Sequence, residues 1–192
     1  MEIHNFSTFP LENPKYVFPV AINYTQNSVE KKWEAVRSHD SVAVLLYHKE
    51  KNAFLLVKQF RPAVYLNNQS HGITYELCAG ILDKEIELLQ TVREEIDEEC
   101  GFNVLIDQIQ KITSFYTSVG VAGAHQTIYY AEIDESMKIH DGGGINDEEI
   151  ELFYLPVIEA KKFALDENIP KTPGLMFAFY WFFDVKGINY FS

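Results

Sequence analysis

The segment between Gly80 and Gly101 constrains the fold most, because it combines a helical apolar stripe with a run of carboxylates. On a helix that advances about 100° per residue, four apolar side chains fall within one arc and predict a helix over residues 87–100 with one buried face. The stripe consists of Leu88, Leu89, Val92 and Ile96. The same arithmetic places Glu99 inside the apolar arc and Glu95 at its edge.

Glu95 and Glu99 would carry like charges one helical turn apart at the edge of a core, which destabilises a helix unless a cation compensates for them. A hard divalent ion with oxygen ligands is the economical compensator. The alternative is a structural pair of acids bridged by an Arg or Lys from elsewhere in the chain. On the opposite face, four charged side chains are expected to be solvated, namely Glu87, Arg93, Glu94 and Asp97.

The charge of the chain limits the partners that it can bind. The 192 residues include 28 acidic and 16 basic ones, which gives a formal net charge of −12. Because such a field repels a polyanion, the composition argues against nucleic-acid binding by phosphate neutralisation. Small anionic substrates remain compatible, since divalent cations held by carboxylates reverse the field locally.

Cysteine content and hydropathy indicate a location. Two cysteines, Cys78 and Cys100, cannot make a disulfide framework, and no cationic and apolar leader opens the sequence. We therefore expect a reducing cytoplasm. The most apolar late stretch, residues 175–183, is far shorter than the roughly 20 residues of a membrane-spanning helix, so no membrane partner is expected.

Strand-like runs dominate the chain, with helical segments between and after them. The expected strands are 41–47, 53–60, 73–79, 112–116, 126–133 and 151–155, and the expected helices are 87–100, 158–166 and 173–184. This order is typical of an α+β domain with a mixed sheet flanked by helices, here residues 39–192. Residues 1–38 are expected to be a β arm in which 16–24 and 29–37 form a small antiparallel sheet, packed on the domain or on a second subunit.

The acid-rich segment resembles the Nudix box, which begins with Gly and ends with Arg-Glu, an aliphatic residue, any residue, Glu-Glu, any residue and Gly. Aligned on Gly80, its metal-binding end matches Glu95, Ile96, Glu98, Glu99, Gly101 and Phe102. Two positions depart from the pattern, since Ile86 replaces a Glu and Glu94 replaces an Arg. Glu85 and Arg93 lie one residue earlier with the same spacing, and would restore a similar pair in a rearranged loop. The departures therefore bear on loop geometry more than on metal binding.

Further segments are similar to the ADP-ribose and UDP-sugar diphosphatase branch of the Nudix hydrolases. They are 39–42, 57–65, 76–80, 142–144 and 169–172. The resemblance implies the Nudix fold, with mixed β-sheets sandwiched between helices and a small N-terminal antiparallel sheet that forms a homodimer. It also implies Mg²⁺-dependent hydrolysis of a nucleoside diphosphate sugar to a nucleoside monophosphate and a sugar phosphate, with Mn²⁺ as a substitute ion. UDP-glucose and ADP-ribose are the expected substrates.

The resemblance assigns roles at the acidic helix. Glu95, Glu98 and Glu99 would hold the metal, and Glu98 is also expected to take part in catalysis. The backbone carbonyl of Ala79 would be a further ligand. Glu76, three residues upstream, is expected to contact the substrate or to support the metal ligands.

A further catalytic Glu is expected from a mobile loop, as in the related diphosphatases. The loop is 140–149 in this chain, and its glycines permit motion. Counting back from Ile150 places Glu148 at the family's acid position, with Asp147 and Glu149 as alternatives because the loop is short. The competing interpretation is a solvated acidic loop without a catalytic role.

Arg61 and Phe60, at the end of a predicted strand, match a stretch that contacts substrate in the resembling branch. A guanidinium suits a diphosphate or a stacked base, while a surface Arg without a partner is the alternative. Residues 116–123 are expected to border the active site.

Two other functions fit parts of the pattern. A Nudix-fold module that binds a nucleotide-sugar or a protein without turnover would explain Ile86 and Glu94, although the metal-binding glutamates are retained. An acidic interaction protein without a ligand would leave Glu99 unexplained on the apolar arc.

Overall fold

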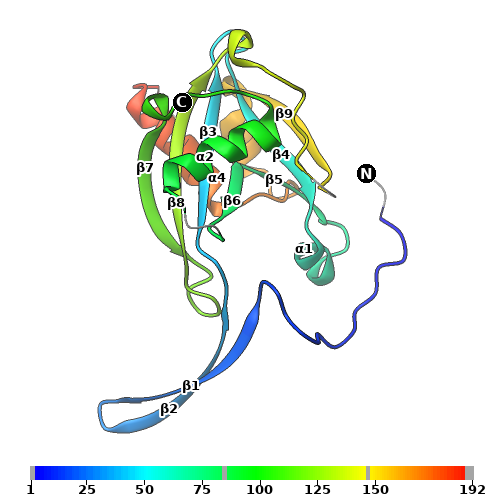
Figure 1. Cartoon of the computed structure of the whole chain (residues 1–192), viewed down its shortest axis with the longest axis vertical. Helices are drawn as coiled ribbons and strands as arrows, with labels where there is room; N and C mark the ends of the chain where they lie inside the picture. Colours follow the sequence, from blue (N-terminus) through cyan, green and yellow to red (C-terminus); the bar gives the residue numbers. More distant parts are fainter. Residues whose placement is uncertain (1–2, 84–85, 146–147, 189–192) are drawn as a thin grey trace.

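The computed structural model describes residues 3–83, 86–145 and 148–188, which form a mixed seven-stranded sheet, a separate two-stranded sheet and helices on both sides (Figure 1). The strands of the large sheet are β3 (Ser41–His48), β4 (Ala53–Phe60), β5 (Ile73–Glu76), β6 (Cys78–Ile81), β7 (Gln110–Thr117), β8 (Ala124–Ile133) and β9 (Ile150–Pro156). The helices are α1 (Pro62–Asn67), α2 (Leu88–Glu95), α3 (Ala160–Leu165) and α4 (Pro173–Val185). β3 and β8 are parallel, and the other pairings of the large sheet are antiparallel. The predicted α+β fold with a mixed sheet between helices is confirmed.

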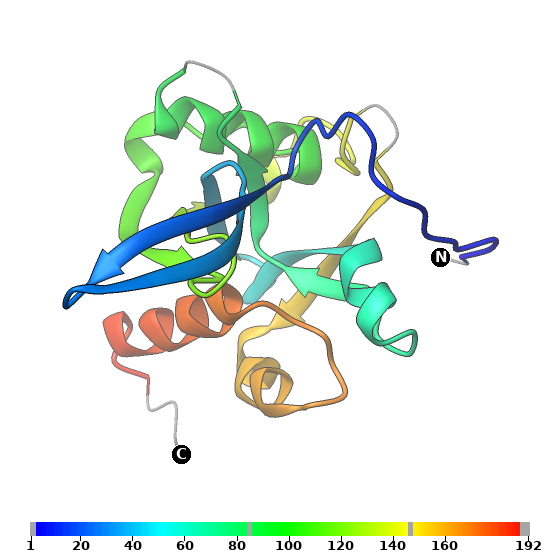
Figure 2. The same ribbon diagram turned by 90° about the horizontal axis from the view of Figure 1, so that it is seen from below.

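The central strands are buried on both faces, as their near-continuous apolar runs predict. Along β3, Ala43 and Leu45 point into one core, whereas Val42, Val44 and Leu46 point into the other. α3 and α4 cover the first face and α2 covers the second, so the sheet lies between two helical layers (Figure 2). The acidic segment therefore lies on a helix that a hydrophobic core holds against the sheet.

β3 and β4 pair only over the residues next to their turn and then take different neighbours. β6 pairs with β3 over 41–44, and β5 pairs with β4 over 57–60. The single strand predicted over 73–79 is therefore two strands, which change partner at Leu77. This change of partner places residues 76–80 where the sheet divides, next to the end of the acidic helix.

The acidic helix is less regular than predicted. α2 ends at Glu95 and continues as the π-helical turn η1 (Ile96–Cys100), which Gly101 ends with a φ of 76°. A π turn has a wider hydrogen-bonding pattern than the α-helix, so a wheel of about 100° per residue does not hold there. Val92 and Ile96 are buried as predicted, but Leu88 is 37% exposed. The prediction was wrong for Leu88 because the helix begins at this residue, outside the core.

The N-terminal arm forms the two-stranded sheet from β1 (Phe18–Gln26) and β2 (Val29–Arg37) (Figure 1). Asn27 and Ser28 join the strands with positive φ angles of 53° and 64°, as a tight hairpin turn requires. The arm touches the domain where Val36 N–H donates to the carbonyl of Val121 at 2.8 Å. The small antiparallel N-terminal sheet is confirmed.

α4 has the sequence signals of a helix start. Thr172 precedes it and its Oγ1 accepts a hydrogen bond from Leu175 N–H at 3.4 Å, and Pro173 occupies the first position. Its 13 residues include the apolar stretch noted above, and Phe179 is fully buried. Among the described residues, no helix has the length and apolar character needed to cross a membrane.

Candidate active site

Glu99 points from the π-helical turn into the protein, and its exposed fraction is 5%. Its Oε2 accepts a hydrogen bond from Ala79 N–H at 2.9 Å, and the Cys78 thiol donates another. Burial raises the pKa of Glu99 to about 8, the two hydrogen bonds act in the opposite direction, and the charges of Glu95 and Glu148 raise the pKa further. A carboxyl in this environment takes up a proton unless a cation is bound beside it.

Glu95 lies against the backbone of Gly80, so closely that a Cβ atom at position 80 would overlap with its carboxylate. β6 holds Gly80 opposite Val42 of β3, so the sheet fixes this contact. The glycine therefore acts by leaving space for the carboxylate. The structure thus brings Glu95 and Glu99 together at residues 79–80, and the partly buried Glu98 lies on the same π-helical turn.

Glu148, the predicted loop acid, is exposed at the end of the loop before β9. Its Oε2 accepts a hydrogen bond from Ile145 N–H at 3.0 Å. Its charge acts on both Glu99 and Arg61, so the loop carries this carboxylate into the electrostatic range of the cluster. Glu149 is also exposed, and Asp147 lies outside the described residues.

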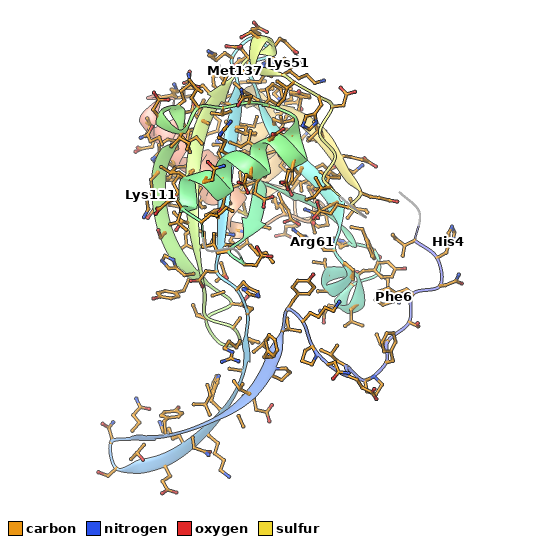
Figure 3. The ribbon with its side chains drawn as sticks, viewed as in Figure 1. His4, Phe6, Lys51, Arg61, Lys111 and Met137 are labelled. Atoms are coloured by element: carbon orange, nitrogen blue, oxygen red, sulfur yellow. The ribbon has the colours of Figure 1, made fainter. Side chains whose placement is uncertain are left out.

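Arg61 is paired with Glu76, which the sequence did not predict. Its Nε and Nη2 each donate to one oxygen of Glu76 at 2.7 Å, and Thr74 Oγ1 donates to the same carboxylate at 2.6 Å. These hydrogen bonds raise the pKa of Arg61, and the charges of Glu76, Glu99 and Glu148 add to this effect. The alternative of a surface Arg without a partner is therefore wrong. Arg61 lies just before α1 and keeps N–H donors for a ligand (Figure 3).

A cavity of about 390 Å³ opens beside Glu76 and Ala79. Apolar side chains of the sheet form part of its wall, and its polar lining includes Tyr116, Thr117, Ser118 and Gln126 together with the start of α4 at 172–174. Sequence reasoning missed Gln126, whereas it expected residues 116–123 to border the site. Phe60 lines a different cavity, where its ring lies 5.4 Å from that of Tyr65. The structure therefore does not bring Phe60 into the cavity of Glu76 and Ala79.

Of the two departures from the box, Ile86 lies just before the helix and Glu94 lies on it. Ile86 is 37% exposed. Glu94 accepts a hydrogen bond from Gln90 Nε2 at 2.9 Å, one helical turn earlier. Arg93 donates from Nη2 to Asn103 Oδ1 at 3.4 Å, and Glu85, its predicted partner, lies outside the described residues. Glu94 thus has a local polar contact where the family pattern has an Arg, whereas Ile86 is an exposed apolar residue before the helix begins.

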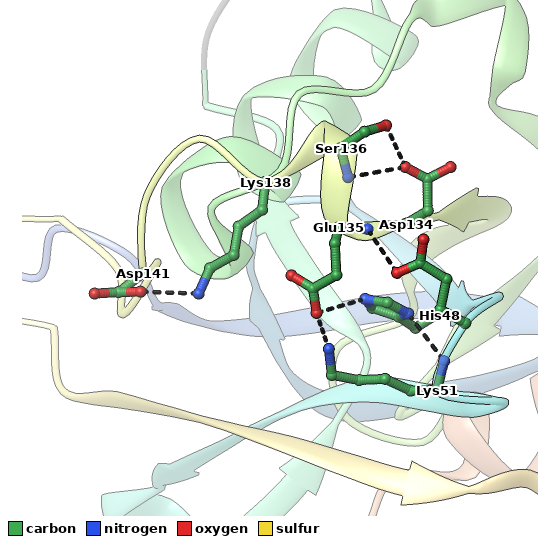
Figure 4. A network of polar contacts seen from close by, with 8 residues as sticks. His48, Lys51, Asp134, Glu135, Ser136, Lys138 and Asp141 are labelled. Carbon is green, nitrogen blue, oxygen red and sulfur yellow. Dashed lines mark hydrogen bonds and ion pairs between the residues drawn. The ribbon is translucent and has the colours of Figure 1, made fainter.

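A second group of potential metal ligands lies at the turn between β3 and β4, near Lys51 and away from the β1–β2 ribbon (Figure 3). His48, Glu50 and Glu135 bring their ligand atoms within 4.8 Å of one another. However, the Lys51 ammonium pairs directly with the Glu135 carboxylate, and His48 Nδ1 accepts from Lys51 N–H at 3.4 Å (Figure 4). Because Lys51 already compensates the charge of Glu135, this group is a structural ion-pair cluster.

Comparisons with known proteins identify the family and the fold. The NUDIX domain family matches residues 37–173. The chain is 35% identical to the uridine diphosphate glucose pyrophosphatase NUDT14 of Bos taurus over 88% of each chain, and 37% identical to the GDP-mannose pyrophosphatase of Cronobacter sakazakii over 72% of this chain and 74% of that one. A crystal structure of an ADP compounds hydrolase superposes with a TM-score of 0.70 and 13% identity, covering 92% of this chain and 91% of the other. The chain therefore belongs to the Nudix family of hydrolases.

Proposed function

We propose that the protein hydrolyses the diphosphate bond of a nucleoside diphosphate sugar and releases a nucleoside monophosphate and a sugar phosphate. The observation that carries this proposal is the convergence of Glu95 and Glu99 at residues 79–80, beside a cavity and an Arg61 anchored by Glu76, with the charge of Glu148 acting on Glu99 and Arg61. The names of the two relatives support a nucleotide-sugar as the substrate class. UDP-glucose is the first substrate to test and ADP-ribose the second.

Mg²⁺ fits the residues that meet at the acidic helix, because their donors are hard oxygen atoms. Glu95, Glu98 and Glu99 would hold the ion, with the carbonyl of Ala79 as a further ligand. The buried Glu99, whose pKa is raised to about 8, is the carboxyl that gains most from a neighbouring cation. When bound, the ion neutralises negative charge on the diphosphate. Mn²⁺ prefers the same class of ligands and is expected to substitute.

The side chains of the chain itself supply the remaining chemistry. Glu148 accepts the proton of the water that attacks phosphorus, after its carboxylate leaves Ile145 N–H. Arg61 donates its remaining N–H groups to a phosphate, while Glu76 fixes the plane of the guanidinium. The cavity of about 390 Å³ receives one of the two groups that flank the diphosphate. The catalytic roles of Glu98 and Glu149 remain predictions, as does the contact of Phe60 with the substrate.

The N-terminal arm, residues 1–38, is proposed to form a homodimer of the hydrolase domain, residues 39–192. One face of the ribbon carries Val20, Ile22 and Tyr24, which are 40%, 42% and 40% exposed. Trp33, opposite Ile22 across the ribbon, is 52% exposed. An apolar face of this kind is buried by a partner more often than it is left in solvent. A cytoplasmic location is part of the same proposal.

A turnover assay tests the proposed reaction. The wild type and Glu99→Gln are each incubated with Mg²⁺ and either UDP-glucose or ADP-ribose, and the release of nucleoside monophosphate is followed. Glu135→Gln, in the distant ion-pair cluster, is the matched control for the loss of one carboxylate. We expect release that requires metal, collapses in Glu99→Gln and persists in Glu135→Gln. Saturable binding of both substrates without release would refute hydrolysis and favour a binding module.

A further inference from the structure

The loop before β9 is docked on the backbone of the π-helical turn. Gly143 N–H donates to the carbonyl of Glu99 at 2.8 Å, and Gly144 N–H donates to the carbonyl of Glu98 at 3.1 Å. The last carbonyls of a helix have no partner within the helix, so groups from outside must satisfy them. Here the loop satisfies the carbonyls of two residues whose side chains belong to the acidic cluster.

Two glycines make this close approach possible. Gly142 has a φ of +67°, and a Cβ atom there would overlap with the carbonyl of Glu99 and lie 2.8 Å from the carbonyl carbon of Cys100. Gly101 faces it with a φ of +76°, and a Cβ atom on this residue would lie 2.8 Å from Gly142 N. The two backbones therefore meet without side chains between them, and a methyl group at either position forces them apart.

His140 makes a second attachment between the same two segments. Its Nδ1 accepts a hydrogen bond from Gly142 N–H at 3.0 Å. Its Nε2 lies 2.7 Å from Oδ1 of Asp97, which belongs to the π-helical turn. One imidazole ring thus connects the glycine segment to the turn that carries Glu98 and Glu99.

The same segment also contacts Glu148 at its other end. A Cβ atom on Gly144 would lie 2.7 Å from Glu148 Oε2. The next residue, Ile145, donates its N–H to that oxygen at 3.0 Å, and Gly143 accepts a hydrogen bond from Ile150 N–H at 3.2 Å where β9 begins. Residues 140–144 therefore touch both halves of the proposed site, the metal-facing turn and the loop acid.

We infer that residues 140–144 are a clasp that sets the position of the π-helical turn relative to Glu148, so that Gly142 and His140 are positioning residues for the carboxylates of Glu98 and Glu99. The sequence suggested that the glycines serve loop motion, but their hydrogen bonds attach this part of the loop to the helix end. The catalytic role of the clasp rests on the proposed function. Its effect on Mg²⁺ affinity can be measured without turnover.

Calorimetric titration with Mg²⁺ alone tests the clasp with a matched pair of glycine variants. Gly142→Ala combines positive φ with the overlap described above, whereas Gly187→Ala has a similar φ of +65° and no atom within 4 Å of its added Cβ. We expect Gly142→Ala to bind Mg²⁺ about tenfold more weakly or worse, as when groups that orient metal ligands are lost, and Gly187→Ala to match the wild type. Equal affinities in the two variants would overturn the inference.

His140 variants keep the test decisive if Gly142→Ala does not fold. His140→Ala removes both contacts of a half-exposed ring without a backbone clash, and His140→Asn keeps an acceptor for Gly142 N–H. We expect faster amide exchange at Gly143 and Gly144 and weaker Mg²⁺ binding in His140→Ala, with partial rescue in His140→Asn.

In turnover, a positioning role lowers kcat more than it raises KM, because the substrate cavity is unchanged. Unchanged exchange and unchanged Mg²⁺ affinity in His140→Ala would contradict the clasp. If the wild type binds Mg²⁺ and the variants show these changes, but the wild type turns over neither substrate, the proposed function alone would be refuted.

Discussion

The buried carboxyl of Glu99 makes the stability of the metal-free protein depend on pH. Its pKa is raised to about 8 in the folded state, chiefly by burial. The folded protein therefore favours the protonated form, and the associated stability is complete below the unfolded pKa and is lost as the pH rises through the folded pKa. Glu99→Gln removes this titration and keeps an oxygen that can accept from Ala79 N–H.

The size of the effect follows from the two pKa values. Unfolding returns the pKa of Glu99 from about 8 to near 4.5, and each unit corresponds to about 1.4 kcal/mol. Between pH 5 and pH 9, the wild type is therefore expected to lose about 4 kcal/mol of unfolding free energy relative to Glu99→Gln. Because the side chain is only 5% exposed, solvent screening reduces this figure little.

Urea denaturation in EDTA at pH 5, 7 and 9 measures this difference, with both proteins compared at each pH. Titrating groups that do not interact with Glu99 contribute equally to both proteins, so they cancel in the difference between them. Mg²⁺ is expected to abolish most of the loss above pH 7, and its affinity for the wild type is expected to rise with pH up to about 8, because binding displaces the Glu99 proton. A free-energy difference that does not change with pH would refute the reasoning.

Two further substitutions test the contacts around the cluster. Gly80→Ala places a methyl group on the Glu95 carboxylate, so Mg²⁺ affinity measured by calorimetry should fall about tenfold or more, whereas Gly120→Ala, with open space around its Cβ, should leave the affinity unchanged. Arg61→Lys cannot reproduce the two hydrogen bonds to Glu76, so steady-state assays should show kcat/KM reduced about tenfold or more, and an unchanged value would remove Arg61 from the substrate contacts.

The burial of Glu99 was predicted from the helical wheel and is confirmed, although Glu99 lies on the π-helical turn, where the α-helical wheel no longer holds. The π-helical turn itself could not be predicted, since the docked loop satisfies its carbonyls and that loop lies more than 40 residues further along the chain. For Leu88 the helical wheel predicted burial, but the side chain is exposed at the first residue of the helix. Periodicity gives the direction in which a side chain points, but not whether the helix end reaches the core.

The pairing of Arg61 with Glu76 shows a second limit of sequence reasoning. The two residues lie 15 positions apart, Arg61 just after β4 and Glu76 at the end of β5, and they meet because the strand pairing brings Val57 opposite Glu76 and Phe60 opposite Ile73. The division of the predicted strand 73–79 at Leu77 has the same origin, because a continuous run of strand-forming residues does not reveal where a strand changes partner. Local sequence patterns thus predicted the strands and helices, whereas the contacts within the site depend on how the strands pair.

Anomalous diffraction from crystals of the protein soaked in Mn²⁺ tests the central claim most directly, because Mn²⁺ uses the same oxygen ligands as Mg²⁺ and can be located by its scattering. We expect an anomalous peak between the carboxylates of Glu95 and Glu99, beside residue 79. A peak confined to the cluster of His48, Glu50 and Glu135, or none at the acidic helix, would contradict it.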